Sequence, residues 1–208
     1  MSIEPSLPRI GAVIAAAGLS RRMGSPKQLL PWGNSTVIAS VVEHLHEAGA
    51  APILVVTGHR HDEVAAAISN TTAQPIYNAD YANAEMLSSY QVGLRTLATE
   101  DCAGVLLALG DQPHIPVRTL RQLVKQAQTT PDVIVIPSFA MRRGHPFYMP
   151  RGLWPELSAL RENETLRTLV TRHHAQIRYV TVDSDAILHD MDTPADFAQR
   201  KAAADISH

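Results

Sequence analysis

The apolar stretch at residues 10–17, IGAVIAAA, ends at Gly18 and leads directly into a loop that carries several cationic side chains. An uninterrupted apolar run of this length, closed by a turn-forming residue, is typical of a strand buried on both faces in a parallel sheet. Open sheets of this class bind their ligands just beyond the carboxyl ends of the strands. The sequence therefore predicts that the loop after residue 17 faces a ligand.

Strand-like and helix-like segments alternate along most of the chain, which is typical of an α/β fold with helices on both faces of the sheet. Gly144 and its flanking prolines break this rhythm, and we expect a β-type excursion at residues 137–150. The pattern predicts a Rossmann-like three-layer sandwich with a mostly parallel sheet, formed by residues 1–208 as one domain. We expect further strands at residues 52–58, 74–77, 103–111, 132–137 and 177–183, and helices at residues 36–48, 61–69, 117–128 and from Pro194 onward.

The composition restricts the partners that the chain can bind. Its net charge of −2 argues against broad nucleic-acid binding, which requires a basic surface. No apolar run approaches the roughly 18 residues of a membrane-spanning helix, and residues 1–10 lack the apolar core of a secretory signal. A single cysteine, Cys102, excludes an internal disulfide framework and suits a reducing compartment. We therefore expect a cytoplasmic protein with no nucleic-acid or membrane partner.

The loop after the first strand has the residue types that bind a polyphosphate. Gly18 and Gly24 allow the backbone to approach an anion closely, and Arg21, Arg22 and Lys27 supply positive charge. The loop differs from the two common phosphate motifs, because it contains neither G-x-G-x-x-G nor the G-K-[S/T] ending of a P-loop. Its residue types nevertheless predict a site for a nucleoside triphosphate.

Residues 16–31 resemble the signature A-A-G-x-S-x-R-M-G-x-x-K-x-L-L-P of the molybdenum cofactor nucleotidyltransferases, and they are most similar to the cytidylyltransferase branch. The matching residues are Ala16, Ala17, Gly18, Ser20, Arg22, Met23, Gly24, Lys27, Leu29, Leu30 and Pro31. The resemblance implies the nucleotidyltransferase fold, with CTP and a molybdopterin-type phosphate acceptor as the two substrates. It also implies phosphate-binding, catalytic roles for Arg22 and Lys27, and nucleotide contacts from Ala16, Ala17, Gly18, Leu19 and Ser20.

Two acidic sites supply candidate metal ligands. Asp111 follows an apolar run, so its carboxylate would lie at the ligand-binding edge of the sheet. Asp190 and Asp192 are two positions apart in a segment expected to be extended, so both side chains would project to the same side. Carboxylates, together with phosphate oxygens and water, suit Mg²⁺. The sequences around these sites, G-D-x-P and D-x-D-T-P, resemble metal-binding elements of the same family. The resemblance implies Mg²⁺ held by Asp111, which is then also catalytic, and by Asp192, with Asp190 as the alternative second ligand.

Two further segments resemble nucleotide-binding elements of the family. The first is the end of the second predicted strand. The second, at residues 78–88, resembles an N-x-D-Y-x-x-G-x-x-x-S stretch that lies over the nucleotide, although Ala84 or Glu85 stands where that pattern often has glycine. The resemblance implies nucleotide contacts from Thr57, Gly58, Asn78 and Ser88.

A third group of residues is expected to meet the acceptor. Residues 144–146 match a G-H-P element that faces the second substrate in the family, which makes His145 and the neighbouring Arg143 candidates. Arg167 matches the arginine of a G-D-x-G-x-R pattern, whereas Asn163 and Thr165 depart from it. The acceptor site is therefore expected to include Arg143, His145 and Arg167.

The resemblance implies transfer of CMP from CTP to the acceptor phosphate, with release of pyrophosphate. Two alternatives stay within this class: a guanylyltransferase, and a cytidylyltransferase for a methylerythritol or sugar phosphate. Against the first, Ala17 stands where the guanylyl branch has a second glycine, and Lys27 follows the R-M-G core one residue sooner. A different alternative is a maturation factor for molybdoenzymes that binds the nucleotide without turning it over. A client molybdoenzyme is a further expected partner.

Overall fold

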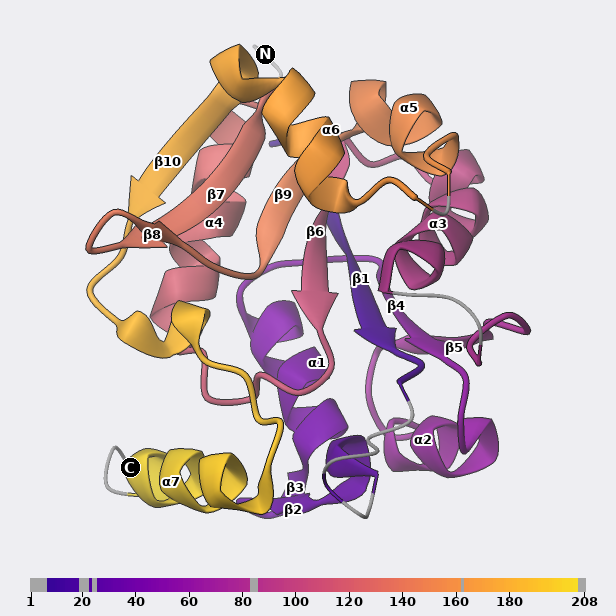
Figure 1. The fold of residues 1–208 in the computed structure, drawn as a ribbon, viewed down its shortest axis with the longest axis vertical. Helices are drawn as coiled ribbons and strands as arrows, with labels where there is room; N and C mark the ends of the chain where they lie inside the picture. The colour runs from indigo at the N-terminus through magenta and orange to yellow at the C-terminus, as the bar shows by residue number, and fades with distance from the viewer. Residues whose placement is uncertain (1–6, 19–22, 24–25, 83–85, 162, 206–208) are drawn as a thin grey trace, which may run out of the picture.

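The computed structural model describes residues 7–18, 23, 26–82, 86–161 and 163–205. Its main sheet contains β1 (Ile10–Ala16), β4 (Ile53–Thr57), β5 (Gln74–Tyr77), β6 (Gly104–Leu109), β7 (Ile134–Phe139), β8 (Arg142–Arg143), β9 (Phe147–Pro150) and β10 (Ile177–Thr181). The strand order is β10-β7-β9-β6-β1-β4-β5, and β8 pairs with β7 (Figure 1). A separate short hairpin is formed by β2 (Pro31–Trp32) and β3 (Ser35–Thr36).

The sheet is mostly parallel, as the sequence predicted. β1 runs parallel to both β4 and β6, β4 to β5, and β7 to β10. β9 is the exception, because it runs antiparallel to its neighbours β6 and β7. At the carboxyl end of β1, Ala15 pairs with Leu109 and Ala16 pairs with Thr57. The loops that follow β1, β4 and β6 therefore leave the sheet at one common edge.

Helices cover both faces of the sheet and make a three-layer sandwich (Figure 1). Side chains of β1 alternate between two buried clusters, with Ile14 in one and Val13 in the other, as the pleat of a strand requires. The first cluster includes residues of α1 (Val37–Glu47), α2 (His61–Ala67) and α4 (Val117–Thr129). The second includes residues of α3 (Met86–Thr96), α5 (Trp154–Ser158) and α6 (Leu166–Arg172). The remaining helices are α7 (Pro194–Asp205) and the short 3₁₀ helices η1 (Lys27–Leu29), η2 (Leu97–Thr99), η3 (Arg151–Leu153), η4 (His174–Gln176) and η5 (Asp185–Leu188).

The predicted strands and helices are all present, with boundaries that differ by at most two residues. α3, α5, α6 and the β2–β3 hairpin lie outside the predicted segments. α5 and α6 are short, and α3 begins within the stretch that resembles a nucleotide-binding element. Within the described part of the chain, no helix is both long and apolar enough to cross a membrane.

The excursion at residues 137–150 forms β8 and β9, as expected. Its turn places Ala140 and Met141 at positive φ, and its second half returns to the sheet through Gly144. A Cβ atom at Gly144 would overlap the backbone of Ile187 in η5. Glycine at this position therefore lets the segment before α7 pack closely against the sheet.

Candidate active site

A cleft of about 280 Å³ opens at the carboxyl ends of β1 and β6. Part of its wall comes from these two strand ends, and the rest comes from segments far apart in the chain. The described lining residues are Ala15, Ala17, Gly18, Lys27, Gln28, Tyr81, Met86, Ser89, Leu109, Gly110, Asp111, Asp190 and Asp192. The cleft therefore lies at the sheet edge where the sequence predicted a ligand.

Lys27, the first residue of η1, connects the two predicted metal ligands. Its Nζ atom forms an ion pair with Oδ2 of Asp111 and donates a hydrogen bond of 3.1 Å to Oδ1 of Asp192. The side chains of Lys27 and Asp111 are 17% and 11% exposed, so this contact is largely shielded from water. Asp111 and Asp192 thus converge in one site, although 81 positions separate them in the chain.

Negative charge predominates among the described lining residues. Burial lowers the pKa of Lys27, but the charges of Asp111 and Asp192 and their hydrogen bonds outweigh burial and raise this pKa above its ordinary value. Lys27 is therefore protonated at neutral pH. Asp190 adds a third carboxylate, whose pKa is raised by burial and by the negative charges of Asp111 and Asp192. Among the described lining residues, one ammonium group thus shares the cleft with three carboxylates.

The donor set of the cleft fits a hard divalent cation such as Mg²⁺. Mg²⁺ is commonly held by one or two carboxylates, with water and substrate phosphates as its other ligands. The described residues include no group of three or more His, Cys, Asp or Glu side chains arranged to hold a metal without a substrate. Asp111 and Asp192 would therefore be the protein's ligands in a site that also requires phosphate oxygens.

The predicted nucleotide loop lies partly within the described residues. Ala17 and Gly18 line the cleft, whereas the side chain of Ala16 packs in the first core cluster. The Ala16 carbonyl accepts a hydrogen bond of 3.5 Å from Nε2 of Gln28, a cleft residue that the sequence did not indicate. Leu19, Ser20 and Arg22, which were also predicted to bind the nucleotide, lie outside the described residues.

Thr57 and Gly58 lie at the carboxyl end of β4, but neither is among the described residues that line the cleft. Thr57 is fully buried; its hydroxyl donates to the Ile76 carbonyl at 3.1 Å and lies 2.6 Å from Nδ1 of His61. A Cβ atom at Gly58 would overlap Tyr81, which does line the cleft. In this structure the two residues hold β4, β5 and the Tyr81 loop together, and their nucleotide contacts stay a prediction.

Asn78 and Ser88 bind each other. Nδ2 of Asn78 donates a hydrogen bond of 2.9 Å to Oγ of Ser88, and Oδ1 of Asn78 accepts one of 3.1 Å from the Asp80 amide. The pair thereby connects the end of β5 to the first turn of α3. The neighbouring Ser89, together with Tyr81, lines the cleft instead.

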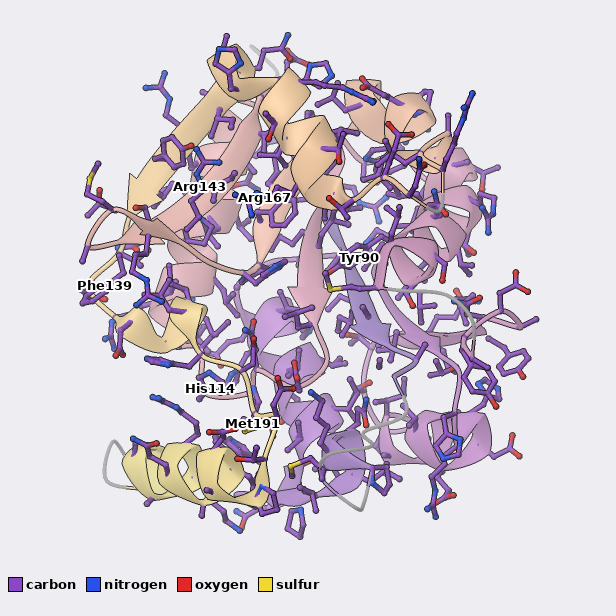
Figure 2. All side chains as sticks on the ribbon, in the orientation of Figure 1. Tyr90, His114, Phe139, Arg143, Arg167 and Met191 are labelled. Carbon is purple, nitrogen blue, oxygen red and sulfur yellow. The ribbon has the colours of Figure 1, made fainter. Side chains whose placement is uncertain are left out.

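The three predicted acceptor residues lie at different depths. The guanidinium of Arg143, on β8, stacks over the ring of Tyr179 at 5.1 Å, and Arg167 is exposed on α6 (Figure 2). His145 is closer to the carboxylates: burial lowers its pKa, while the charges of Asp190 and Asp111 act in the opposite direction. His145 therefore lies within electrostatic reach of the cleft carboxylates.

Two residues that the sequence did not indicate fix the acidic segment to the sheet. Nε2 of Gln112 donates to the His189 carbonyl at 3.2 Å and to Oδ1 of Asp190 at 3.0 Å. Nε2 of His114 lies 3.2 Å from the Ala186 carbonyl and 3.1 Å from the His189 carbonyl, so this nitrogen carries the ring proton. Burial lowers the pKa of His114 to about 4. The signal in the sequence is the polar run D-Q-P-H directly after an apolar strand.

The comparison with protein families decides the class of the molecule. Residues 12–177 match the MobA-like NTP transferase domain, a range that runs from β1 to the start of β10 and includes Lys27 and Asp111. The chain belongs to this family. It is therefore a nucleotidyltransferase, and its cleft lies at the carboxyl ends of the central strands of this domain.

Curated relatives within the family differ in the nucleotide that their names specify. The chain is 27% identical to the molybdenum cofactor cytidylyltransferase of Escherichia coli K12 over 92% of its own length and 95% of that protein. It is 28% identical to the molybdenum cofactor guanylyltransferase of Mesorhizobium japonicum over 91% of its length and 93% of that protein. The two identities are too similar to choose between the nucleotides.

Solved structures share the fold along almost the whole chain. A nucleotidyl transferase from Methanothermobacter superposes with a TM-score of 0.81 and 25% identity, covering 96% of this chain and 99% of the other. Rv0371c from Mycobacterium tuberculosis, solved in complex with manganese, superposes with a TM-score of 0.75 and 27% identity, covering 95% and 100%. The three-layer nucleotidyltransferase fold is therefore established for this chain.

Proposed function

We propose that this nucleotidyltransferase transfers CMP from CTP to the phosphate of a molybdopterin-type acceptor and releases pyrophosphate. The observation that carries the proposal is the contact of Lys27 with both Asp111 and Asp192 in the cleft beside the glycine-containing loop. A cation next to two carboxylates, at the carboxyl edge of the sheet, suits a triphosphate that arrives with a divalent ion. The similarity to molybdenum cofactor cytidylyl- and guanylyltransferases supports the choice of acceptor, and the choice of CTP rests on the residues of the first loop.

The proposed reaction is an in-line displacement at phosphorus. An oxygen of the acceptor phosphate attacks the α-phosphorus of CTP and forms a new P–O bond. The bond from the α-phosphorus to the α–β bridging oxygen breaks on the opposite side, and pyrophosphate leaves with the electron pair. The acceptor phosphate is already ionised near neutral pH, so the step needs no general base. Positioning and charge neutralisation are then the main catalytic tasks of the protein.

The cleft residues have distinct tasks in this reaction. Lys27, together with Arg22 from the same loop, would bind the β- and γ-phosphates and stabilise the charge on departing pyrophosphate. Asp111 and Asp192 would hold Mg²⁺, which supplies neutralisation of the phosphate charge at the reacting phosphorus. His145, with Arg143 and Arg167 farther out, would orient the acceptor. The protein thereby aligns two polyanions whose mutual repulsion otherwise opposes the reaction.

The test is pyrophosphate release from purified protein incubated with Mg²⁺, molybdopterin and each of the four nucleoside triphosphates in turn. We expect release with CTP and molybdopterin, and none when the acceptor is omitted. The same assay with a methylerythritol or sugar phosphate in place of molybdopterin tests for another acceptor, which would be identified by pyrophosphate release. Release with GTP in preference to CTP would move the chain to the guanylyl branch. Tight CTP binding without any release would instead favour the non-catalytic maturation factor.

A further inference from the structure

We propose that Gln112 and Met191 are positioning residues that hold the Asp190–Asp192 segment at the distance from Asp111 that metal binding requires. This inference rests on the proposed function, because it takes Asp111 and Asp192 as the metal ligands. Neither residue needs to touch a substrate. Each acts through the segment that carries Asp190 and Asp192.

Gln112 connects the two halves of the acidic site by direct bonds. It follows Asp111 in the chain, and its amide nitrogen donates to the His189 carbonyl at 3.2 Å and to Oδ1 of Asp190 at 3.0 Å. Both partners are acceptors, so only the NH₂ end of the amide can face them. A shift of the 189–192 segment away from Asp111 would therefore break two hydrogen bonds of one side chain.

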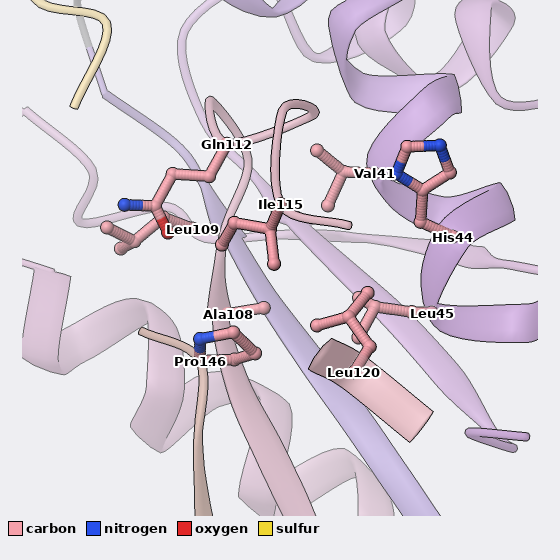
Figure 3. Close-up of a pocket in the computed structure, with 9 residues that line it drawn as sticks. All are labelled: Val41, His44, Leu45, Ala108, Leu109, Gln112, Ile115, Leu120 and Pro146. Atoms are coloured by element: carbon pink, nitrogen blue, oxygen red, sulfur yellow. The ribbon is translucent and has the colours of Figure 1, made fainter. Parts of the chain in front are cut away.

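The stability of the fold does not explain a glutamine at this position. Gln112 is 5% exposed, and its Oε1 atom is buried with no hydrogen-bond partner among the described residues. Behind it lies a small cavity of about 10 Å³, lined mainly by apolar side chains such as Val41, Leu45 and Leu120 (Figure 3). A buried acceptor without a partner costs free energy, and an apolar side chain of the same length would avoid this cost. The role of the Nε2 hydrogen bonds is therefore better sought in the active site.

Met191 anchors the same segment from the other side. It is fully buried in a small cluster with Trp32 and Val37, against which Phe197 of α7 packs. The two flanking residues, Asp190 and Asp192, both line the cleft. Burial of Met191 on one side of the segment thus directs both carboxylates to the opposite side.

The anchors are needed because like charges meet in the cleft. Among the described lining residues, the carboxylates of Asp111, Asp190 and Asp192 share the cleft with one ammonium group, that of Lys27, so negative charge is in excess there. Repulsion between carboxylates favours displacement of the 189–192 segment from Asp111. Gln112 and Met191 oppose that displacement before a cation binds.

The experiment compares Gln112→Met with Gln91→Met, a matched control. Gln91 makes similar hydrogen bonds, because its Nε2 donates to the carbonyls of Leu157 and Leu160 at 3.2 and 3.1 Å. These bonds connect α3 to α5, away from the cleft. The readouts are the affinity for Mn²⁺, measured by electron paramagnetic resonance with and without CTP, and the melting temperature. We expect Gln112→Met to weaken Mn²⁺ binding about tenfold, as loss of a residue that orients a metal ligand does, without lowering the melting temperature.

The control should show the opposite pattern, with a lower melting temperature and wild-type Mn²⁺ affinity. Met191→Ala should also weaken Mn²⁺ binding, and Met191→Leu, which conserves volume, should restore it. Wild-type Mn²⁺ affinity in both Gln112→Met and Met191→Ala would overturn this inference alone. If Asp111→Asn binds Mn²⁺ as well as the wild type, or the wild type binds none, the metal assignment fails and this inference fails with it.

Discussion

The Nζ atom of Lys27 lies 3.1 Å from Oδ1 of Asp192, although 165 positions separate the two residues in the chain. The same atom pairs with Asp111 after β6, so a single ammonium group joins the first loop, the central strand and the C-terminal segment. Because the Lys27–Asp111 pair is largely shielded from water, removing the ammonium group takes this counter-charge away from a shielded carboxylate. This arrangement makes the cleft sensitive to the charge of each of its members.

Lys27→Met removes the ammonium charge but keeps the hydrocarbon stem. We expect a loss of roughly 3 kcal/mol in the free energy of unfolding, because the largely shielded carboxylate of Asp111 then loses the ammonium group that it contacts. Added Mg²⁺ should recover more stability in this variant than in the wild type. Urea unfolding with and without Mg²⁺ measures both effects, and Lys125→Met, on the exposed face of α4, is the control. A variant as stable as the wild type would contradict the importance of this ion pair.

Variants of the same loop test whether its cationic side chains bind the phosphates of CTP. Lys27→Ala and Arg22→Ala should each weaken CTP binding and slow pyrophosphate release, because charge-assisted bonds to phosphate are strong polar contacts. Arg21→Ala is the control, since the family signature places its arginine at position 22. CTP titration and steady-state rates measure the effects. A larger loss from Arg21→Ala than from Arg22→Ala would show that the assumed register of this loop is wrong.

Asp111→Asn keeps the size of the side chain but removes one negative charge from the proposed metal site. Pyrophosphate release should fall at least about a hundredfold, the scale of losing one preorganised electrostatic group. The melting temperature should stay close to that of the wild type, because the change also relieves repulsion with Asp190. Asp132→Asn, at an exposed position, is the matched control. Near-normal release by Asp111→Asn would remove this residue from metal binding.

The fold and the location of the cleft could be predicted because both follow from local patterns. The apolar runs determine parallel strands, and parallel strands bring their carboxyl ends to one edge, where Asp111 and Gly18 then lie. Asp111 and Asp192, which the family resemblance made candidate ligands of one ion, both contact Lys27 in the structure, and their metal binding stays a prediction. The path of the segment that carries Asp192 depends on Gly144, which lets the chain before α7 pack against the sheet.

Other parts of the site depend on contacts that no local pattern reveals. Gly110, which lines the cleft, packs closely against β1: a Cβ there would lie 3.0 Å from the Ala16 Cβ and 3.1 Å from the Ala15 carbonyl. That glycine therefore accommodates β1. The hydrogen bonds of Gln112 to residues 189 and 190 likewise join segments far apart in sequence, so they became visible only in the folded chain.

The buried His114 should make stability depend on pH. Its pKa is about 4 in the folded chain, below the ordinary value of 6.5, so between these pH values the unfolded chain binds a proton that the folded chain does not. Stability is therefore fully present above pH 6.5 and is lost as the pH falls toward 4. The loss by pH 5 should be about 2 kcal/mol.

Urea unfolding at pH 7 and pH 5 checks this expectation. His114→Gln keeps a donor at the position of Nε2 but cannot titrate, so its loss between the two pH values should be smaller than that of the wild type. His174→Gln, at an exposed position, should behave as the wild type does. Equal pH dependence in His114→Gln and the wild type would show that another group causes the acid sensitivity.

The base preference is expected to depend on Ala17. This residue is 7% exposed and lines the cleft beside Gly18, so its methyl group occupies space that a second glycine would leave to the nucleotide. Compared with the guanylyl branch, this loop has Ala17 in place of a glycine and is one residue shorter between the R-M-G core and Lys27. Both differences should suit a pyrimidine better than a purine. A pocket that hydrogen-bonds one base rejects another strongly, because mismatched polar groups are left without partners on burial.

We therefore expect CTP to be used at least about a hundredfold better than GTP, measured as the ratio of kcat/KM values with molybdopterin as acceptor. Ala17→Gly should narrow this ratio, because it removes the methyl group that opposes the larger base. Asp111→Asn is the control: it should slow both reactions and leave the ratio unchanged, since the metal site contacts phosphates common to all four nucleotides. Equal use of the two nucleotides by the wild type, or a preference for GTP, would overturn the assignment of CTP. The fold and the contact of Lys27 with the two carboxylates would stand in either case, because neither depends on the base.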